Sequence, residues 1–198
     1  MYEERRGYRW KLAVRLDNSF QFLIEPAVKI VEGFSANRST FMSWVAGLVD
    51  ADGTLYLAND QRYARISFTI ANENLEVLRS ISRILGVLGY HTNGPYLAYS
   101  AGTTTPYGIT YKNDLWRLFL QRSGEVQQLL QELPIRHSER ILQKELASSL
   151  TLPTRWAEVE VQVREMRKAV EAERDEFREL AEQAYLAKRT PVHEKDRV

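Results

Sequence analysis

Two carboxylates, Asp50 and Asp52, are the residues best suited to catalysis, and they end the ten-residue stretch Trp44–Gly53. An apolar flank and a small step at Ala46 and Gly47 predict a helix that stops at the final glycine. The carbonyl end of a helix carries partial negative charge, which disfavours each acid there by about 0.3–1 kcal/mol. Two acids at that end therefore need a nearby cation or have another use. Oxygen ligands suit hard divalent ions such as Mg²⁺ or Ca²⁺.

Helical and strand periodicities alternate around this stretch. A helix from Ser39 precedes two alternating strands at 54–57 and 63–70, and Asn74 then caps a helix that runs to Leu88. Further strands are predicted at 90–92, 96–100 and 107–111, and helices at 113–121, 125–133 and 138–150. This order predicts an α+β unit with an antiparallel sheet, repeated as half-units.

Two flanking segments extend this core, which is assigned to residues 38–152. Residues 1–37 are predicted to form an N-terminal extension, with a β-hairpin over 8–25 and a linker with a short helical turn over 26–37. Residues 153–198 carry a heptad seam, which predicts a long helix over 154–188 of roughly 50 Å and a disordered tail. Such a helix must pack along the body, pair with another copy, or project.

Composition excludes several classes of protein. The chain has 198 residues, of which 44% are hydrophobic and 27% are charged, so global disorder is excluded. Cysteine is absent, which removes disulfides, thiolate metal sites and cysteine nucleophiles and is consistent with a cytoplasmic protein. No apolar run is long enough to span a membrane. The net charge is only +1, so any site for a polyanion must come from a local arrangement.

The stretch Val45–Gly53 resembles the LAGLIDADG motif of homing endonucleases, Leu-Ala-Gly-Leu-Ile-Asp-Ala-Asp-Gly, with valine at two positions. The elements that follow match the family's αββαββα order through about Leu150. The resemblance implies a homing-endonuclease-like fold whose antiparallel sheet forms a saddle for DNA. It also implies that two motif helices pack side by side, with the dimer interface formed by Val45, Ala46, Gly47 and Leu48.

Catalytic roles also follow from the resemblance. It implies that Asp52 is the metal-binding carboxylate, that the Ala51 carbonyl helps to hold the ions, and that Asp50 is a structural group at the helix end. The ions are expected to be Mg²⁺, with Mn²⁺ or Ca²⁺ able to occupy the same site, and they activate water for phosphodiester hydrolysis. Because only one motif is present, a complete site requires a homodimer, and a symmetric reader implies a long, near-palindromic double-stranded target.

Polar side chains on the first two predicted strands are candidates for DNA contact. Alternation places six of them on one face: Thr54, Tyr56, Tyr63, Arg65, Ser67 and Thr69. The cationic face of the N-terminal hairpin, Arg9, Lys11 and Arg15, could add phosphate contacts that do not depend on base sequence. Both patterns also fit ordinary solvated surfaces.

Two further catalytic positions follow from the resemblance. Family members place a polar residue at the end of the second strand, which Asn72 matches. They also place a lysine or arginine in a later loop-to-helix segment, where Arg136 and Arg140 both qualify. The alternative for the second position is that Ser138 caps a helix and Arg140 is solvated on its first turn.

The leading interpretation is therefore a metal-dependent, site-specific DNA endonuclease, encoded within an intron or as a free-standing mobile gene. The alternative within the fold is an intron maturase or a non-cleaving DNA-binding regulator. Relatives of that kind tend to lose the motif acid, so the intact Asp52 favours cleavage. A third interpretation treats the heptad segment as the functional part of a coiled-coil interaction protein.

Overall fold

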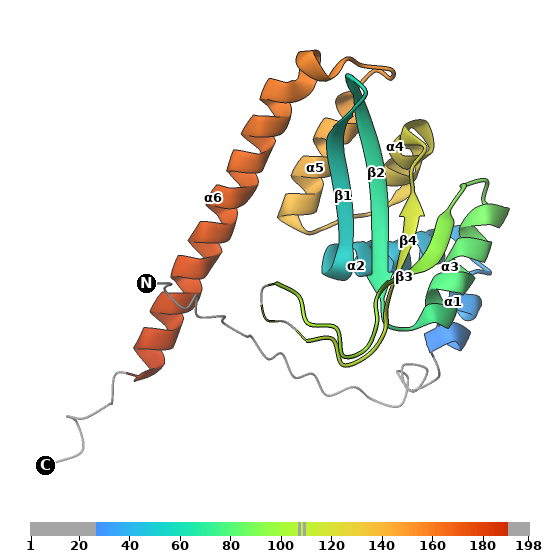
Figure 1. Cartoon of the computed structure of the whole chain (residues 1–198), viewed down its shortest axis with the longest axis horizontal. Helices are drawn as coiled ribbons and strands as arrows, with labels where there is room; N and C mark the ends of the chain where they lie inside the picture. Colours follow the sequence, from blue (N-terminus) through green and yellow to red (C-terminus); the bar gives the residue numbers. More distant parts are fainter. Residues whose placement is uncertain (1–26, 107, 109, 190–198) are drawn as a thin grey trace, which may run out of the picture.

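The computed structural model describes residues 27–106, 108 and 110–189, without the side chains of Ala27, Asp52, Tyr185 and residues 187–189. Its elements run in the order α1 (Ala27–Phe34), α2 (Arg38–Asp52), β1 (Gly53–Asp60), β2 (Tyr63–Asn72), α3 (Leu75–Val87), β3 (Asn93–Tyr99), β4 (Leu115–Leu120), α4 (Ser123–Glu132), α5 (Ser138–Ser149) and α6 (Trp156–Arg189). From α2 to α4 this is the predicted αββαββα order, followed by α5 and the long C-terminal helix α6 (Figure 1). No described helix is both long and apolar enough to cross a membrane.

The four strands form one antiparallel sheet in the order β1-β2-β4-β3. Alternate strand residues are buried and form a core with the helices: Leu55, Leu57, Ile66, Phe68, Ile70, Leu118 and Leu120. Helices α2 and α5 lie behind β1 and β2 in Figure 1. The intervening strand residues lie on the other face of the sheet, called the open face below.

The segment expected to be a linker contains α1. Val31 in this helix is fully buried and belongs to the core cluster. Helix α1 packs beside α2 and α3, so residues 27–34 contribute to the core that supports the motif helix. The predicted hairpin over residues 8–25 lies outside the described residues.

The prediction for residues 107–121 was wrong in two places. Residues 115–120, expected to be helical, form β4, and no strand forms over the described residues of 107–111, where an isolated bridge joins Thr104 and Thr110. Asn113 and Asp114 resemble helix caps, but their side chains instead contact Glu73 and the Ala101 backbone N–H. The alternation of buried Leu118 and Leu120 with half-buried neighbours has the period of a strand and completes the sheet beside β2.

Helix α6 packs along the fold with the first half of its heptad seam. Val159, Val163 and Val170 are buried there, whereas Phe177 and Leu180 on the distal turns are more than half exposed. Arg167 donates to the Leu57 carbonyl at the free edge of β1 (3.2 Å). Figure 1 shows the C-terminal end of α6 extending beyond the rest of the fold.

Gly53 is required by the close approach of β1 to the last turn of the motif helix. A Cβ atom at this position would lie 2.6 Å from Val49 Cα and 2.8 Å from the Val49 carbonyl oxygen. Both neighbours are backbone atoms, which cannot move aside as a flexible side chain could. The final glycine of the motif therefore has a steric function in this single chain.

We predict that Gly53→Ala lowers the free energy of unfolding by about 1–3 kcal/mol, because the added methyl group forces the backbone to shift. Urea denaturation followed by circular dichroism measures the change. Gly86→Ala is the matched control, since a Cβ there meets no atom within 4 Å. That control should gain about 0.5–1 kcal/mol from its improved helix propensity. Equal stability of the two variants would contradict the steric explanation.

Candidate functional site

The C-terminal end of α2 is fixed by one of its own acids. The Asp50 carboxylate accepts hydrogen bonds from the backbone N–H groups of Arg136 (3.0 Å) and His137 (3.2 Å). Asp50 is therefore engaged in joining the motif helix to the connection between α4 and α5. Ala51 is exposed at the same helix end, and the Asp52 side chain lies outside the described part of the chain.

The N-terminal end of α2 is fixed by a charged network. Arg38 donates two hydrogen bonds to the Glu132 carboxylate (2.6 and 2.8 Å), and the Tyr90 hydroxyl donates a third (2.6 Å). The bonds from Arg38 are the main cause of a lowered pKa for Glu132. Burial of the phenol, together with its bond to Glu132, raises the pKa of Tyr90 to about 12.

These contacts tie the α4–α5 connection along the motif helix. Glu132 meets the first turn of α2, and the backbone at 136 and 137 meets its last turn. Between them, Leu133 is fully buried, and its carbonyl oxygen accepts a hydrogen bond from Lys144 (2.8 Å). A segment about 85 to 95 residues away in the chain thus sets the position of both ends of α2.

The two candidate basic residues have different environments. Arg136 is exposed, and its backbone N–H is bound by Asp50 at the end of the motif helix. Arg140 is one turn further along, with its side chain only 16% exposed and its guanidinium donating to Glu139 (3.2 Å) and Gln143 (3.1 Å). Its Nε is buried without a hydrogen-bond partner among the described atoms. Arg140 is therefore neither solvated nor directed to the helix end by any described contact.

Glu139 links Arg140 to the long C-terminal helix. Its side chain is 9% exposed and receives hydrogen bonds of 2.7–3.0 Å from the Arg174 guanidinium. These residues line a cavity of about 370 Å³ that also contacts Thr54, Tyr56 and Arg167. Burying a carboxylate is costly unless it is paired, so Arg174 offsets the desolvation of Glu139 and fastens α6 to α5.

Asn72 lies at the same end of the sheet as the motif acids, since Gly53 pairs with Ile70. The strand alternation places Asn72 with the residues of the helix-covered face, such as Ile70, rather than with those of the open face. Its side-chain oxygen accepts a hydrogen bond from the Asn74 backbone N–H (2.8 Å). Asn72 therefore shapes the turn into α3, and its proposed catalytic role stays a prediction.

The four residues of the predicted dimer interface differ in their exposure, and the interface itself stays a prediction. Val45 and Ala46 are buried in the core of the single chain. Leu48 is partly buried against the same core, whereas Gly47 is exposed, and a Cβ there would meet no atom within 4 Å. Small residues exposed along one side of α2 include Ser39, Ser43, Gly47 and Ala51. They recur every four residues, so they form one stripe along the helix.

All six strand residues predicted to contact DNA lie on the open face. Thr54 pairs with Thr69, Tyr56 with Ser67, and Ala58 with Arg65, so their side chains share one side of the sheet. Thr69 is only 6% exposed in the single chain, and its contact with DNA stays a prediction. Arg65 forms an ion pair with Asp60 (2.9 Å) on the same face, and both side chains remain substantially exposed.

Strands β3 and β4 extend the open face with residues that sequence reasoning missed. Arg117 pairs with Tyr96 and lies with its guanidinium carbon 5.6 Å from the centre of the Tyr99 ring. Tyr96 also contacts Phe119, with ring centroids 6.4 Å apart. The period-two alternation within 115–120 could have identified these positions, but the segment was predicted to be helical.

The remaining predicted contacts have no structural description. Arg9, Lys11 and Arg15 lie outside the described residues. Among the described side chains, no group of three or more histidine, aspartate or glutamate residues could hold a metal ion.

The end of α2 is chemically suited to a hard divalent cation. The last carbonyl groups of a helix have no intrahelical partner and carry partial negative charge. Here the Val49 carbonyl accepts from the Gly53 N–H, and Ala51 is exposed next to the motif acid. Carbonyl and carboxylate oxygens are the ligands preferred by Mg²⁺ and Ca²⁺, so Asp52 and the Ala51 carbonyl fit such an ion.

A comparison with known families agrees with this fold, in which a helix that ends in two acids packs against a four-stranded antiparallel sheet. The sequence model of the LAGLIDADG-like domain matches residues 42–146, which is more than half of the chain. The chain therefore belongs to the LAGLIDADG-like domain family. The resemblance seen in Val45–Gly53 and the predicted fold class are confirmed.

Two solved structures of the homing endonuclease I-CvuI are similar to this chain. One is a complex with its target in the presence of 2 mM Ca, with 19% identity, a TM-score of 0.38, and coverage of 56% of this chain and 64% of that one. The other is a complex with the I-CreI target in the presence of 2 mM Mg, with DNA not cleaved, at 19% identity, a TM-score of 0.35, and coverage of 54% and 62%. This chain thus spans less than two thirds of either structure, and the family assignment rests on the sequence match. No curated protein matches the chain closely.

The Tyr90 network predicts a loss of stability at high pH. The folded chain raises the pKa of Tyr90 from 10.0 to about 12, so the protonated phenol stabilises the fold fully below pH 10. That stabilisation, up to roughly 2–3 kcal/mol, is lost as the pH rises from about 10 to about 12. Urea denaturation across this range measures it, and Tyr90→Phe should show a shallower decline than the wild-type chain. An identical decline in the two proteins would rule out the Tyr90 contribution.

Proposed function

We propose that this protein is a homodimeric, divalent-metal-dependent endonuclease that cleaves double-stranded DNA at a long, near-palindromic site. The observation that carries the proposal is the end of the motif helix. Asp50 is engaged by the backbone N–H groups of Arg136 and His137, so Asp52 is the motif acid left for a metal ion. Membership of the LAGLIDADG-like family supports the same role for this helix end.

A divalent ion, when bound, would supply a Lewis acid and an activated water for in-line displacement at phosphorus. Asp52 and the Ala51 carbonyl would hold it. Mg²⁺ is the expected ion, and Mn²⁺ or Ca²⁺ could occupy the same ligands. The chain's own contribution is to hold these groups rigidly, because α2 is tied at both ends to the 132–137 segment.

Arg136 is the stronger candidate for the basic residue of the site. The Asp50 carboxylate holds its backbone beside the end of α2, and its side chain is exposed. From there a guanidinium can reach a scissile phosphate and stabilise the charge that develops on its oxygens. Arg140 is instead confined by Glu139 and Gln143, which favours a structural role.

The exposed stripe of α2 supports pairing of two copies about a two-fold axis. Ser43, Gly47 and Ala51 have small side chains or none, so a second helix could approach closely along them. Pairing there would bring the two Asp52 residues to one place. The partners proposed are thus a second copy of this chain and double-stranded DNA. Cytoplasmic localisation remains the expectation from composition.

The open face is proposed as the DNA-contacting surface. It carries hydroxyl groups at Thr54 and Ser67, phenols at Tyr56 and Tyr96, and guanidiniums at Arg65 and Arg117, which suit phosphates and base edges of the major groove. A net charge of only +1 on the whole chain means that affinity depends on this local arrangement.

The first test is Asp52→Asn, compared with the wild-type protein on sites selected by cleavage of a random duplex library in Mg²⁺. Loss of the charged ligand should slow cleavage at least about a hundredfold, because metal ions supply several kcal/mol of transition-state stabilisation. Binding of the selected duplex, measured by fluorescence anisotropy, should change little. A variant that still cleaves at the wild-type rate would refute the metal assignment.

The second test is Gly47→Leu, which should block close pairing of two α2 helices without disturbing the single chain. The open space around this Cβ position predicts a folded monomer by circular dichroism. Sedimentation should show at least a tenfold weaker dimer, with a parallel loss of double-strand cleavage. Gly86→Leu is the matched control, because its Cβ position is also open and lies on α3. A Gly47→Leu dimer of unchanged affinity would place the interface elsewhere.

A further inference from the structure

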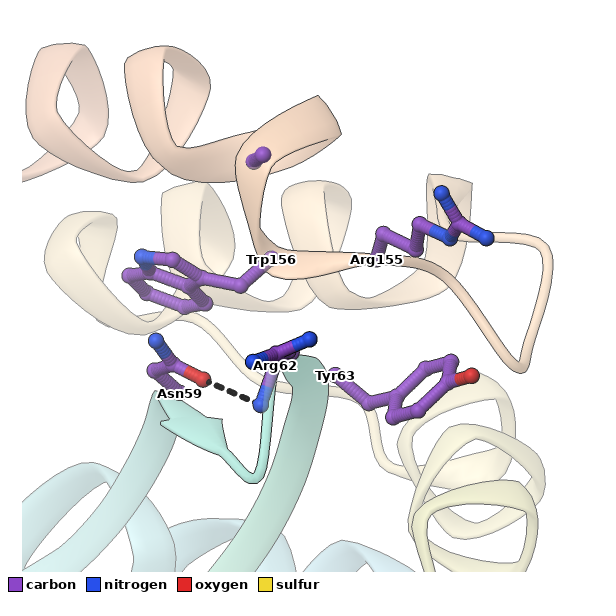
Figure 2. Close-up of a pocket in the computed structure, with 6 residues that line it drawn as sticks. Asn59, Arg62, Tyr63, Arg155 and Trp156 are labelled. Carbon is purple, nitrogen blue, oxygen red and sulfur yellow. Dashed lines mark hydrogen bonds between the residues drawn. The ribbon is translucent and has the colours of Figure 1, made fainter.

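A second candidate binding site lies at the tip of the β1–β2 hairpin. A pocket of about 410 Å³ separates the hairpin turn from the start of α6 and is lined by Asn59, Arg62, Tyr63, Arg155, Trp156 and Ala157. Figure 2 shows the Trp156 ring beside Asn59 and Arg62, whereas the side chains of Arg155 and Tyr63 extend to the opposite side of Arg62. Neither Arg155 nor Trp156 belongs to the region matched by the LAGLIDADG-like domain.

The two walls of this pocket are joined by backbone hydrogen bonds. The Trp156 N–H donates to the Arg62 carbonyl (2.8 Å), and the Ala64 N–H donates to the Thr154 carbonyl (2.9 Å). An antiparallel bridge pairs Tyr63 with Arg155. Trp156 is also partly buried against the core, which fixes its ring. The pocket is therefore formed in the folded chain and does not require a ligand to assemble it.

The lining combines positive charge with aromatic surface. Two guanidiniums line the pocket and no carboxylate does. Both arginines are exposed, and Tyr63 is 49% exposed, so these groups are accessible to a ligand. Arginine recognises phosphate oxygens, and tryptophan and tyrosine rings stack on nucleobases whatever the base. This chemistry suits a ligand that is anionic at one end and flat and aromatic at the other.

The hairpin turn holds Arg62 in an unfavourable backbone conformation. Gln61 has a φ of 51° and Arg62 a φ of 77°, values that two-residue turns usually accommodate with asparagine and glycine. The Asn59 side chain accepts from the Arg62 N–H (3.0 Å) and helps to hold the turn. Glycine at position 62 would relax the backbone, so arginine at this position has a cost in stability.

We propose that this pocket binds one unstacked nucleotide of a nucleic-acid strand, with its phosphate on Arg62 and Arg155 and its base on Trp156. The inference rests on the proposed function, because Tyr63 and Arg65 make the pocket continuous with the open face. A strand that crosses this face would deliver its outer nucleotides to the hairpin tip. The pocket thereby adds a contact beyond the part of the target that the sheet reads.

The test measures binding of a fluorescein-labelled oligothymidylate of twelve nucleotides by fluorescence anisotropy. Thymidine monophosphate and inorganic phosphate serve as competitors. The informative variant is Arg62→Gly, which removes the guanidinium while relieving the strained turn, so misfolding cannot explain lost binding. It should weaken oligothymidylate binding at least about fivefold and reduce the slope of log affinity against log salt by roughly 0.7.

Three further variants sharpen the test. Arg155→Gln should weaken binding to a similar extent, and Trp156→Phe should bind nearly as the wild type because it keeps a stacking ring. Arg164→Gln is the matched control, an exposed arginine two turns along α6 that does not line the pocket. Wild-type binding by Arg62→Gly, or equal competition by phosphate and thymidine monophosphate, would overturn the proposal.

The design separates this site from the proposed endonuclease. If thymidine monophosphate competes as well as the unlabelled oligomer at equal nucleotide concentration, the pocket is a site for free nucleotides. That result would overturn the assignment to a strand. If the wild-type protein cleaves the selected duplexes and Arg62→Gly binds oligothymidylate normally, only the proposal for the pocket is refuted. If the pocket variants weaken binding of oligothymidylate but the wild-type protein never cleaves duplex DNA, only the proposed endonuclease function is refuted.

Discussion

The architecture depends on how the motif helix is held by a segment distant in sequence. Asp50 binds the backbone at 136 and 137, and Arg38 binds Glu132, so the α4–α5 connection is secured along α2 from one end to the other. These contacts join elements that lie about 85 to 95 residues apart in the chain. The geometry of the helix end is thus determined by tertiary contacts more than by the motif itself.

In our proposal the two acids of the motif have different functions. An acid at a helix C-terminus is unfavourable by itself, and two of them would repel each other and the helix dipole. The Asp50 carboxylate is compensated by two N–H groups within the same chain. In our proposal, the partner of Asp52 is a metal ion shared with a second copy. Under that proposal one chain folds with Asp50 already paired and contributes half of the metal site.

Much of the fold could be predicted, because the periodicities of the buried faces are strong. The helix after Asn74 begins as its cap predicts, with the side chain accepting from Glu76 and Val77. Residues 115–120 were predicted to be helical, and their pairing with β2 shows that they form a strand. Asp52 as a metal ligand stays a prediction, and the burial of its neighbours could not be predicted from the sequence. Val45, Ala46 and Thr69 have residue types that suit an interface, yet contacts made by distant elements bury all three.

Both margins of the sheet are closed to strand addition. Along β1, Arg167 donates a hydrogen bond to the Leu57 carbonyl, and helix α6 packs beside the strand. Along β3, Pro95 lacks an N–H group, and two register shifts interrupt the regular pattern. Exposed regular edges are the usual route by which sheets from separate molecules zip together into fibrils. This molecule can therefore leave a broad polar sheet surface uncovered for a ligand at little risk of aggregating through it.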